Sequence, residues 1–247
     1  MTQPKLTIAQ LYPRQMNLYG DWGNVLALKK RIEWRGIDVE VIEYHPGDDF
    51  SGVAQTADIL VGGGGQDSGQ TEVYRDLLEI GDEITRLAND GMPMLMICGM
   101  YQLFGRSFTT VDGTKMQGIG LLDITTAGGE TRMIGNIITH SEQFGDIIGY
   151  ENHSGQTMLG ADMTPFGTVV LGAGNNERDG HEGVLYRNVI GTYLHGSLLP
   201  KNPQVADFLI ETAWKRRYPK EQLPLLDAPH IDELTERART TAAARPR

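Results

Sequence analysis

Cys98 is the only cysteine in the 247-residue chain, and its surroundings suit nucleophilic chemistry. An apolar run at residues 92–97 predicts a strand that ends directly before Cys98, and Gly99 and a predicted helix at residues 100–104 follow. A helix N-terminus stabilises a thiolate, and the free N–H of Gly99 can donate to a developing oxyanion. The alternative is a thiol that packs in the core, and its position alone does not decide between the two.

A second feature is a run of four glycines at residues 62–65, which follows the apolar segment 59–61. Such a loop exposes its backbone amides to a ligand. Phosphate binding is disfavoured because Gln66 and Asp67 follow the glycines where a P-loop needs Gly-Lys-Ser/Thr, and a dinucleotide fingerprint needs glycine in place of Asp67. We expect Gly64 to supply the second oxyanion N–H, and the alternative is a simple turn.

A thiol nucleophile needs a base within hydrogen-bond reach. His195 is a candidate because it ends an apolar strand predicted at residues 189–194 and is followed by Gly196. His140 and His153 are rivals among the six histidines, and spacing alone does not rank His195 above His153. A structural role for His195 also stays open at this point.

The composition excludes several other classes of protein. A single cysteine allows neither an internal disulfide nor a thiolate-rich zinc site, and we expect no metal. The net charge of -10 disfavours binding to nucleic acid, whose phosphates carry the same sign. No run of about 18 apolar residues predicts a membrane helix, and the N-terminus lacks the long apolar region of a signal peptide. We therefore expect a cytoplasmic protein.

The elements that must position these residues alternate between strand and helix patterns in the first two-thirds of the chain. Short connections of this kind predict parallel βαβ units, so we expect an α/β fold with an open, mostly parallel sheet flanked by helices and a β-rich second half. The expected strands are residues 6–11, 39–44, 59–61, 92–97, 118–124, 132–139, 168–172, 183–187 and 189–194, and the expected helices are 25–34, 72–88, 100–104 and 205–214.

The chain is expected to form one domain, residues 1–225, because it contains neither an internal repeat nor a low-complexity linker. Residues 226–247 are a polar C-terminal extension, which we expect to be partly helical or disordered. Its last residues are expected to fray, as chain ends commonly do.

Together, the cysteine turn, the glycine loop and the late histidine resemble a class I, triad-type glutamine amidotransferase in order and approximate spacing. The finer similarity is to the cobyric-acid-synthase-like branch, and within it to the glutaminase subunits of lipid II isoglutaminyl synthases. The similarity spans nearly the whole chain apart from the tail. It is carried by Leu11-Tyr-Pro-Arg-Gln-Met-Asn-Leu-Tyr-Gly-Asp-Trp-Gly-Asn24, Gly62-Gly-Gly-Gly-Gln-Asp67, Cys98-Gly-Met-Tyr-Gln102, Gly149-Tyr-Glu-Asn-His-Ser-Gly155 and Tyr193-Leu-His-Gly196.

The resemblance implies a flavodoxin-like core and a glutaminase that hydrolyses L-glutamine to glutamate and ammonia. It implies that Cys98 is the nucleophile, that His195 is the general base and acid, and that Arg132 binds the α-carboxylate of glutamine. An arginine suits this last task because its planar fork meets a carboxylate with two hydrogen bonds. Without the resemblance, Arg132 is equally well explained as a solvated strand residue.

The same resemblance implies a partner. The ammonia would pass to a Mur-ligase-like synthetase subunit in a heterodimer, which uses ATP and Mg²⁺ to amidate D-glutamate of lipid II to D-isoglutamine in peptidoglycan biosynthesis. This chain shows no ATP motif, so no cofactor is expected in it. Lipid II would be reached through the partner, at the inner face of the membrane.

Two positions depart from the family pattern. The family places glycines two residues either side of the cysteine, where this chain has Met96 and Met100, so we expect an elbow of different shape or one remodelled on complex formation. The usual triad glutamate lies two residues after the histidine, and here that residue is Ser197. We hypothesise a Cys–His dyad, or an orienting carboxylate from elsewhere, such as Asp21 or a partner residue.

Two alternative functions stay open. One is a glutaminase that serves a cobyrinate-type or another amidating synthetase; no ATP-binding domain precedes the glutaminase segments here, which favours the two-subunit system. The other is a non-catalytic, amidotransferase-like subunit that only binds a partner, against which the presence of Cys98, His195 and Arg132 counts. For the enzyme, we expect weak activity alone and higher activity with the synthetase subunit.

Overall fold

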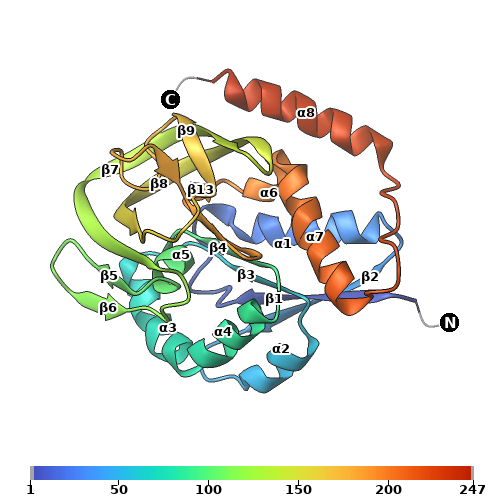
Figure 1. Ribbon diagram of the computed structural model, residues 1–247, viewed down its shortest axis with the longest axis horizontal. Helices are drawn as coiled ribbons and strands as arrows, with labels where there is room; N and C mark the ends of the chain where they lie inside the picture. The colour runs from blue at the N-terminus through green and yellow to red at the C-terminus, as the bar shows by residue number, and fades with distance from the viewer. Residues whose placement is uncertain (1–2, 246–247) are drawn as a thin grey trace.

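The first sheet of the fold contains six strands in the order β11-β12-β4-β3-β1-β2. The computed structural model describes residues 3–245, and this sheet lies between two layers of helices (Figure 1). All neighbouring strands are parallel to each other except for the pair β11 and β12, which is antiparallel. The strands are β1 (Lys5–Leu11), β2 (Asp38–Tyr44), β3 (Ile59–Gly62), β4 (Met94–Ile97), β11 (Val184–Tyr186) and β12 (Val189–Thr192). The predicted α/β fold with a mostly parallel sheet is confirmed.

Helices cover both faces of this sheet because its central strands are apolar throughout. Every residue of β3, β4 and β12 is buried, which is typical of parallel strands covered on both sides. One face carries α1 (Trp22–Glu33) and α7 (Pro203–Arg217) (Figure 1). The other carries α2 (Phe50–Thr56), α3 (Asp67–Glu79) and α4 (Gly81–Asn89). Short helical turns are η1 (Leu18–Gly20), α5 (Gly99–Leu103) and α6 (Leu198–Lys201).

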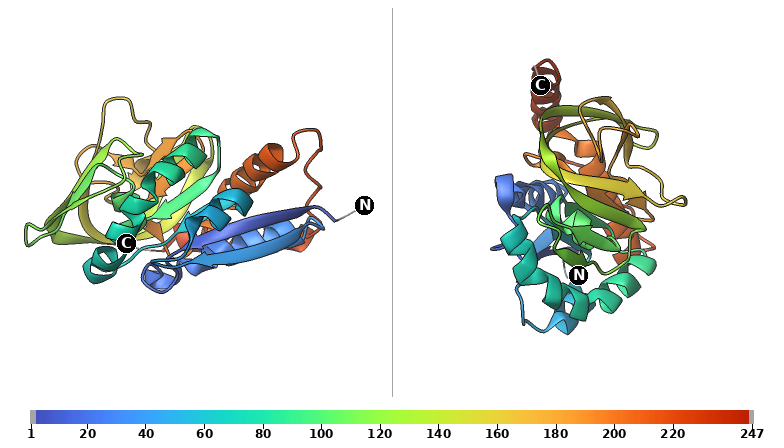
Figure 2. Two further views of the ribbon diagram at one scale, coloured as in Figure 1. Left: turned by 90° about the horizontal axis from the view of Figure 1, so that it is seen from below. Right: turned by 90° about the vertical axis from the view of Figure 1, so that its left-hand side faces the viewer.

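A second, mainly antiparallel sheet lies beside the first, next to α5 (Figure 2). It is built on a long hairpin of β7 (Ile124–Ser141) and β8 (Gly145–Leu159), which confirms a β-rich second half although β8 was not predicted. The remaining strands are β5 (Ser107–Thr109), β6 (Lys115–Gln117), β9 (Gly167–Leu171), β10 (His181–Glu182) and β13 (Leu194–His195).

Three predicted elements are wrong in detail. The helix expected at 72–88 is two helices, broken where Gly81 packs so closely on Ile119 that a Cβ would lie 2.8 Å from its Cγ2. No strand forms at residues 118–123, because the backbone N–H groups there bond to the end of α5 and the turn after it, as Ile119 does to Leu103. The strand expected at 189–194 ends at Thr192, where the chain leaves the first sheet.

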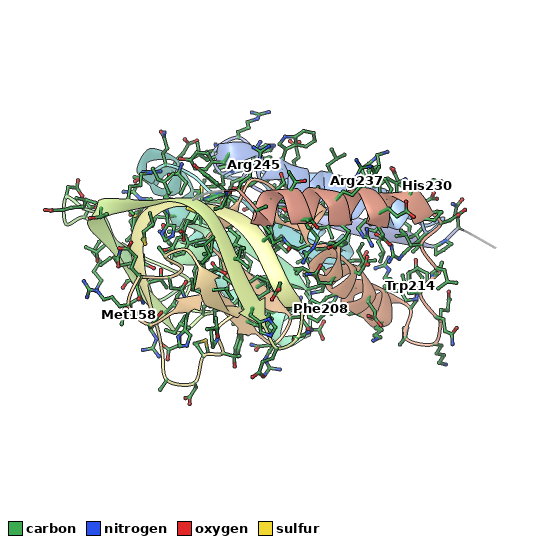
Figure 3. The ribbon with its side chains drawn as sticks, turned by 90° about the horizontal axis from the view of Figure 1, so that it is seen from above. Met158, Phe208, Trp214, His230, Arg237 and Arg245 are labelled. Atoms are coloured by element: carbon green, nitrogen blue, oxygen red, sulfur yellow. The ribbon has the colours of Figure 1, made fainter. Side chains whose placement is uncertain are left out.

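Most of the predicted C-terminal extension is a helix, α8 (Pro229–Ala243), that lies along the outside of the molecule (Figure 3). None of its residues is buried, and Arg239 anchors it by donating to the carbonyl oxygens of Lys201 and Asp146 at 2.7 and 2.8 Å. The helix continues to Ala243, residues 246–247 lie outside the described part of the chain, and the expected fraying of the last residues stays a prediction. The division at residue 225 stays a prediction. Within residues 3–245, no helix combines the length and apolarity needed to span a bilayer.

Candidate active site

Cys98 occupies the sharp turn between β4 and α5, at the end of the first sheet where the parallel strands terminate. Its backbone has φ 50° and ψ -102°, a conformation that a non-glycine residue adopts only under constraint. One constraint is a hydrogen bond from the Cys98 N–H to the carbonyl oxygen of Thr192 in the neighbouring strand, at 2.8 Å. A strained strand-to-helix turn of this kind holds a nucleophile at the edge of the sheet. The side chain is 7% exposed and lines a cavity.

The elbow forms without the glycines that the family places around the cysteine. Met96 and Met100 stand at those positions, and the space they need comes from Gly62 in the adjacent strand β3. A Cβ on Gly62 would lie 2.8 Å from Cγ of Met100 and 3.0 Å from Sδ of Met96. A glycine on the neighbouring strand therefore provides the room that glycines beside the cysteine would otherwise provide.

His195, on β13, faces the carboxylate of Asp21, the residue directly after η1. The Nδ1 atom of His195 lies 3.2 Å from both carboxylate oxygens of Asp21, and both side chains are almost fully buried. A second donor, the N–H of Gly64, bonds to Asp21 Oδ2 at 2.7 Å. The carboxylate is thereby fixed and orients the imidazole, as the acid of a catalytic triad does.

Gly64 marks the point where the thiol, the imidazole and the carboxylate meet. A Cβ on this residue would lie 2.6 Å from Cε1 of His195, 3.1 Å from Oδ2 of Asp21 and 3.2 Å from Cβ of Cys98. The other ring nitrogen of His195, Nε2, is buried and has no hydrogen-bond partner within residues 3–245. Three residues that are distant in sequence thus surround one small volume.

The charges of this cluster favour a protonated His195. Burial of the ring opposes protonation, but the interactions with Cys98 and with the Asp21 carboxylate outweigh it, so the pKa of His195 is raised above its ordinary value. An imidazolium beside a thiolate is the arrangement that keeps a cysteine nucleophile ready to react.

The N–H of Gly64, the predicted oxyanion donor, is bonded to Asp21. The adjacent amide nitrogen of Gly65 lies 3.1 Å from where a Cβ on Gly99 would be, and Gly65 lines the same cavity as Cys98. Among the described atoms, which leave out the side chains of residues 67 and 68, no acceptor bonds to the N–H of Gly65 or to that of Gly99, the other predicted donor. These two amides are therefore available to an oxyanion.

Arg132, on β7, lines the same cavity of about 410 Å³ as Cys98. Its Nη2 donates to the hydroxyl of Tyr19 at 3.0 Å and its Nε to Oδ1 of Asn152 at 2.5 Å. The ring of Tyr19 in turn packs edge-on against His195, with centroids 4.9 Å apart. The structure therefore places the predicted cation and the predicted nucleophile on one cavity, and Tyr19 links the cation to the predicted base.

The rival histidines differ from His195 in their contacts. His153 lines the cavity but stacks flat on Tyr193 at 3.6 Å, and its Nδ1 bonds to the carbonyl oxygen of Gly155 at 3.0 Å. Burial lowers the pKa of His153 to about 3, so this ring stays neutral. His140 is exposed and lies 2.8 Å from Asp146. Only His195 of the three shares its surroundings with Cys98 and a buried carboxylate.

Besides Gly65, sequence reasoning missed two residues of the site, Tyr19 and Asn152. They lie in the segments 11–24 and 149–155, which carry the resemblance, but the resemblance assigned a role to neither residue. The signal was therefore present, but nothing local indicated that both would contact Arg132. Among residues 3–245, no group of three or more His, Cys, Asp or Glu side chains is arranged to hold a metal ion.

Comparison with known proteins agrees with this geometry. The model of the CobB/CobQ-like glutamine amidotransferase domain matches residues 7–203. The chain is 40% identical over 213 residues to the lipid II isoglutaminyl synthase (glutamine-hydrolyzing) subunit GatD of Staphylococcus aureus, covering 86% of each chain. It is also 40% identical to the subunit of the same name of Streptococcus pneumoniae, covering 94% of this chain and 90% of that one.

More distant relatives include the cobyric acid synthase of Limosilactobacillus reuteri, which is 31% identical over 70% of this chain but only 34% of its own length. Two solved structures share the fold. A glutamine amidotransferase of Thermotoga maritima has a TM-score of 0.55 at 15% identity, covering 96% of this chain and 93% of its own. The glutaminase domain of the Trypanosoma brucei CTPS has a TM-score of 0.53 at 10% identity, covering 90% and 98%.

Proposed function

The chain belongs to the CobB/CobQ-like glutamine amidotransferase family, and we propose that it is the glutaminase subunit of a lipid II isoglutaminyl synthase. It hydrolyses L-glutamine to glutamate and ammonia at Cys98. The observation that carries this proposal is the convergence of Cys98, His195 and Asp21 around Gly64, with Cys98 lining a cavity that Arg132 also lines.

Glutamine binds with its α-carboxylate on Arg132 and its carboxamide beside Cys98. The hydrogen bonds to Tyr19 and Asn152 hold the guanidinium in place, which lowers the entropy lost on binding. Placing the carboxamide carbon within reach of the sulfur turns the first step into a reaction within one complex.

In the first step, His195 holds the thiol proton and the Cys98 thiolate attacks the carboxamide carbon. The carbonyl oxygen becomes an oxyanion that the N–H groups of Gly65 and Gly99 stabilise. The His195 imidazolium then gives its proton to the departing nitrogen, ammonia leaves, and a thioester remains. In the second step, His195 takes a proton from water, which attacks the thioester and releases glutamate. Asp21 keeps Nε2 of His195 directed at the reacting atoms throughout.

The ammonia passes to a synthetase subunit. The names of the GatD relatives describe one subunit of a synthase, which implies a partner. In this proposal the partner is Mur-ligase-like and binds the ATP and Mg²⁺ that activate the α-carboxyl of D-glutamate in lipid II. The cobyrinate alternative is less well supported, because this chain matches only 34% of a cobyric acid synthase but 86% and 90% of the GatD subunits.

Glutamate release from L-glutamine tests the enzyme against the non-catalytic reading. The wild-type chain and Cys98→Ala are each assayed alone and with the Mur-ligase-like subunit, ATP and lipid II. We expect release by the wild type, stimulation by the partner, and at least about a 10³-fold loss in Cys98→Ala, since the nucleophile has no substitute. Equal release by both chains would show that Cys98 is not the nucleophile.

The amidated product distinguishes the partners. Mass spectrometry of lipid II after the coupled reaction should show D-isoglutamine only when glutamine and the active glutaminase are both present. Glutamate release without amidated lipid II, under conditions in which added ammonium chloride supports amidation, would contradict the proposed transfer to this partner.

A further inference from the structure

His195 lies directly after the point where the chain crosses from one sheet to the other. β12 ends at Thr192 in the first sheet, paired with β4, and β13 begins at Leu194 in the second sheet, paired with β8. Tyr193 lies between the two strands. Backbone N–H groups at such a crossing belong to neither ladder, and a buried N–H without an acceptor is costly.

Glu182, on β10, provides the acceptor for this crossing. Its side chain is fully buried, and Oε1 accepts the N–H of Tyr193 at 2.7 Å. The hydroxyl of Thr192 donates to the same carboxylate at 2.9 and 3.0 Å and accepts the N–H of Leu194 at 3.1 Å. Glu182 therefore accepts the N–H of Tyr193 directly. It also holds the Thr192 hydroxyl, which accepts the N–H of Leu194.

The same crossing also contacts the nucleophile. The carbonyl oxygen of Thr192, the residue that Glu182 holds through its hydroxyl, accepts the N–H of Cys98 at 2.8 Å. The nucleophile is thus bonded to the first residue of the crossing, while the base follows its last residue. Any rotation of the Thr192–Tyr193 peptide changes the distance between the sulfur and the imidazole.

A carboxylate at this place has an energetic cost that packing alone does not explain. Burial raises the pKa of Glu182 well above its ordinary value, although the donors from Tyr193 and Thr192 oppose the shift. An apolar side chain of similar size would avoid the desolvation but would leave the N–H of Tyr193 and the hydroxyl of Thr192 without an acceptor. The hydrogen bonds to the crossing are therefore the reason for the carboxylate.

We propose that Glu182, acting through Thr192, is a positioning residue that sets the distance and angle between Cys98 and His195. It touches neither the substrate nor the reacting atoms. The proposal rests on the proposed function only because glutamine is the substrate of the kinetic assay. Its second measurement, the alkylation of Cys98, needs no substrate.

The decisive comparison is Thr192→Val against Thr192→Ser, with Glu182→Leu as a third variant that removes the acceptor itself. Valine keeps the shape of threonine but removes the hydroxyl that links Glu182 to Leu194, whereas serine keeps it. A shift of about 1 Å in a catalytic pair lowers the rate by up to 100-fold, so we expect kcat to fall at least tenfold in Thr192→Val and Glu182→Leu. We expect KM to stay within about twofold, because the cavity wall at Arg132 is untouched, and Thr192→Ser to retain most of kcat.

The matched control is Thr139→Val, at a fully buried threonine on β7 whose hydroxyl has no hydrogen-bond partner within residues 3–245. It makes the same change of side chain in a buried strand without removing a hydrogen bond. We expect its kcat to equal that of the wild type.

Alkylation of Cys98 by iodoacetamide gives the independent readout, since the chain has one cysteine and the thiolate is the form that reacts. The alkylation rate should fall in Thr192→Val and Glu182→Leu in parallel with kcat, and recover in Thr192→Ser. Lower thermal stability with unchanged kcat and unchanged alkylation would overturn the proposal and leave Glu182 a structural residue. A wild-type chain that reacts with iodoacetamide as expected but hydrolyses no glutamine would contradict the proposed function instead.

Discussion

The carboxylate of Asp21 lies 3.2 Å from Nδ1 of His195, although 174 residues separate them in the chain. The acid of the triad thus comes from the loop after β1 and not from the segment after the histidine. Ser197, which stands where the family has its glutamate, donates its hydroxyl to the carbonyl oxygen of Gly20 at 2.9 Å. It therefore fastens the loop that carries Asp21, which explains how the site can lack an acid at position 197.

Asp21→Asn tests whether this carboxylate orients the base. Asparagine puts an NH2 group in place of one of the two oxygens that lie 3.2 Å from Nδ1 of His195, and the lost charge no longer supports the imidazolium. We expect kcat to fall roughly 10²-fold with little change in KM, which steady-state kinetics will measure.

The loss of this charge also lowers the pKa of His195, so the alkaline limb of the rate profile should move to lower pH in Asp21→Asn. Asp82→Asn removes an exposed carboxylate on α4 and serves as the control. A kcat within threefold of the wild type in Asp21→Asn would support a bare Cys–His dyad.

Gly64→Ala tests whether the three groups meet at this residue. The added Cβ would lie 2.6 Å from the His195 ring, so the imidazole must move away from Cys98. We expect glutaminase activity to fall at least about tenfold while the chain stays folded, as circular dichroism will show.

Gly52→Ala is the matched control for Gly64→Ala, because a Cβ at this position in α2 meets no atom within 4 Å. It should retain full activity. If Gly64→Ala were as active as Gly52→Ala, the ring could not be as close to Gly64 as it is in the structure.

Arg132→Lys tests the binding of the substrate carboxylate. Lysine keeps the charge but loses the planar fork and the bonds to Tyr19 and Asn152. The loss of a charge-assisted hydrogen bond is worth about 1.5–3 kcal/mol, so we expect KM for glutamine to rise roughly 10- to 100-fold. Steady-state kinetics with Arg178→Lys, an exposed arginine outside the cavity, provide the comparison.

A substrate without the α-carboxylate makes the Arg132 test more specific. Hydrolysis of 4-aminobutanamide should be slow in the wild type and nearly unaffected by Arg132→Lys. An equal effect on both amides would show that Arg132 does not bind the carboxylate.

His153 should make the fold sensitive to acid. Its pKa is about 3 in the folded chain, below the ordinary value near 6.5, so the unfolded chain binds the proton more tightly and stability is lost as pH falls below about 6.5. Between pH 7 and pH 5 this histidine alone should lower the free energy of unfolding by about 2 kcal/mol, at about 1.4 kcal/mol for each pH unit below 6.5.

Urea unfolding at the two pH values measures this effect. His153→Phe keeps a ring against Tyr193 but cannot be protonated, so its stability should fall less between pH 7 and pH 5 than that of the wild type. His230→Phe, at an exposed position on α8, should behave like the wild type. An equal loss in wild type and His153→Phe would contradict a neutral, buried His153.

The parallel sheet was predictable because β3 and β4 are short buried runs next to helical patterns, and β2 alternates apolar and acidic residues. The hairpin of β7 and β8 was harder to predict, since Gly128, Gly129 and several polar residues interrupt the pattern in a strand that extends far beyond the core. The break at Gly81 and the missing strand at 118–123 depend on contacts with each other and with α5, which no local pattern records.

What the sequence by itself determined is the local chemistry around Cys98. The apolar run that ends at Ile97 and the glycine at residue 99 place Cys98 at a strand-to-helix turn, because neighbouring residues set where a strand ends and a helix begins. The tertiary structure alone decided which histidine and which carboxylate reach the thiol, and that Gly65 and not Gly64 has a free amide. Those contacts depend on the order of strands in two sheets and on where the chain crosses between them, and such distances are not encoded in the spacing of residues along the chain.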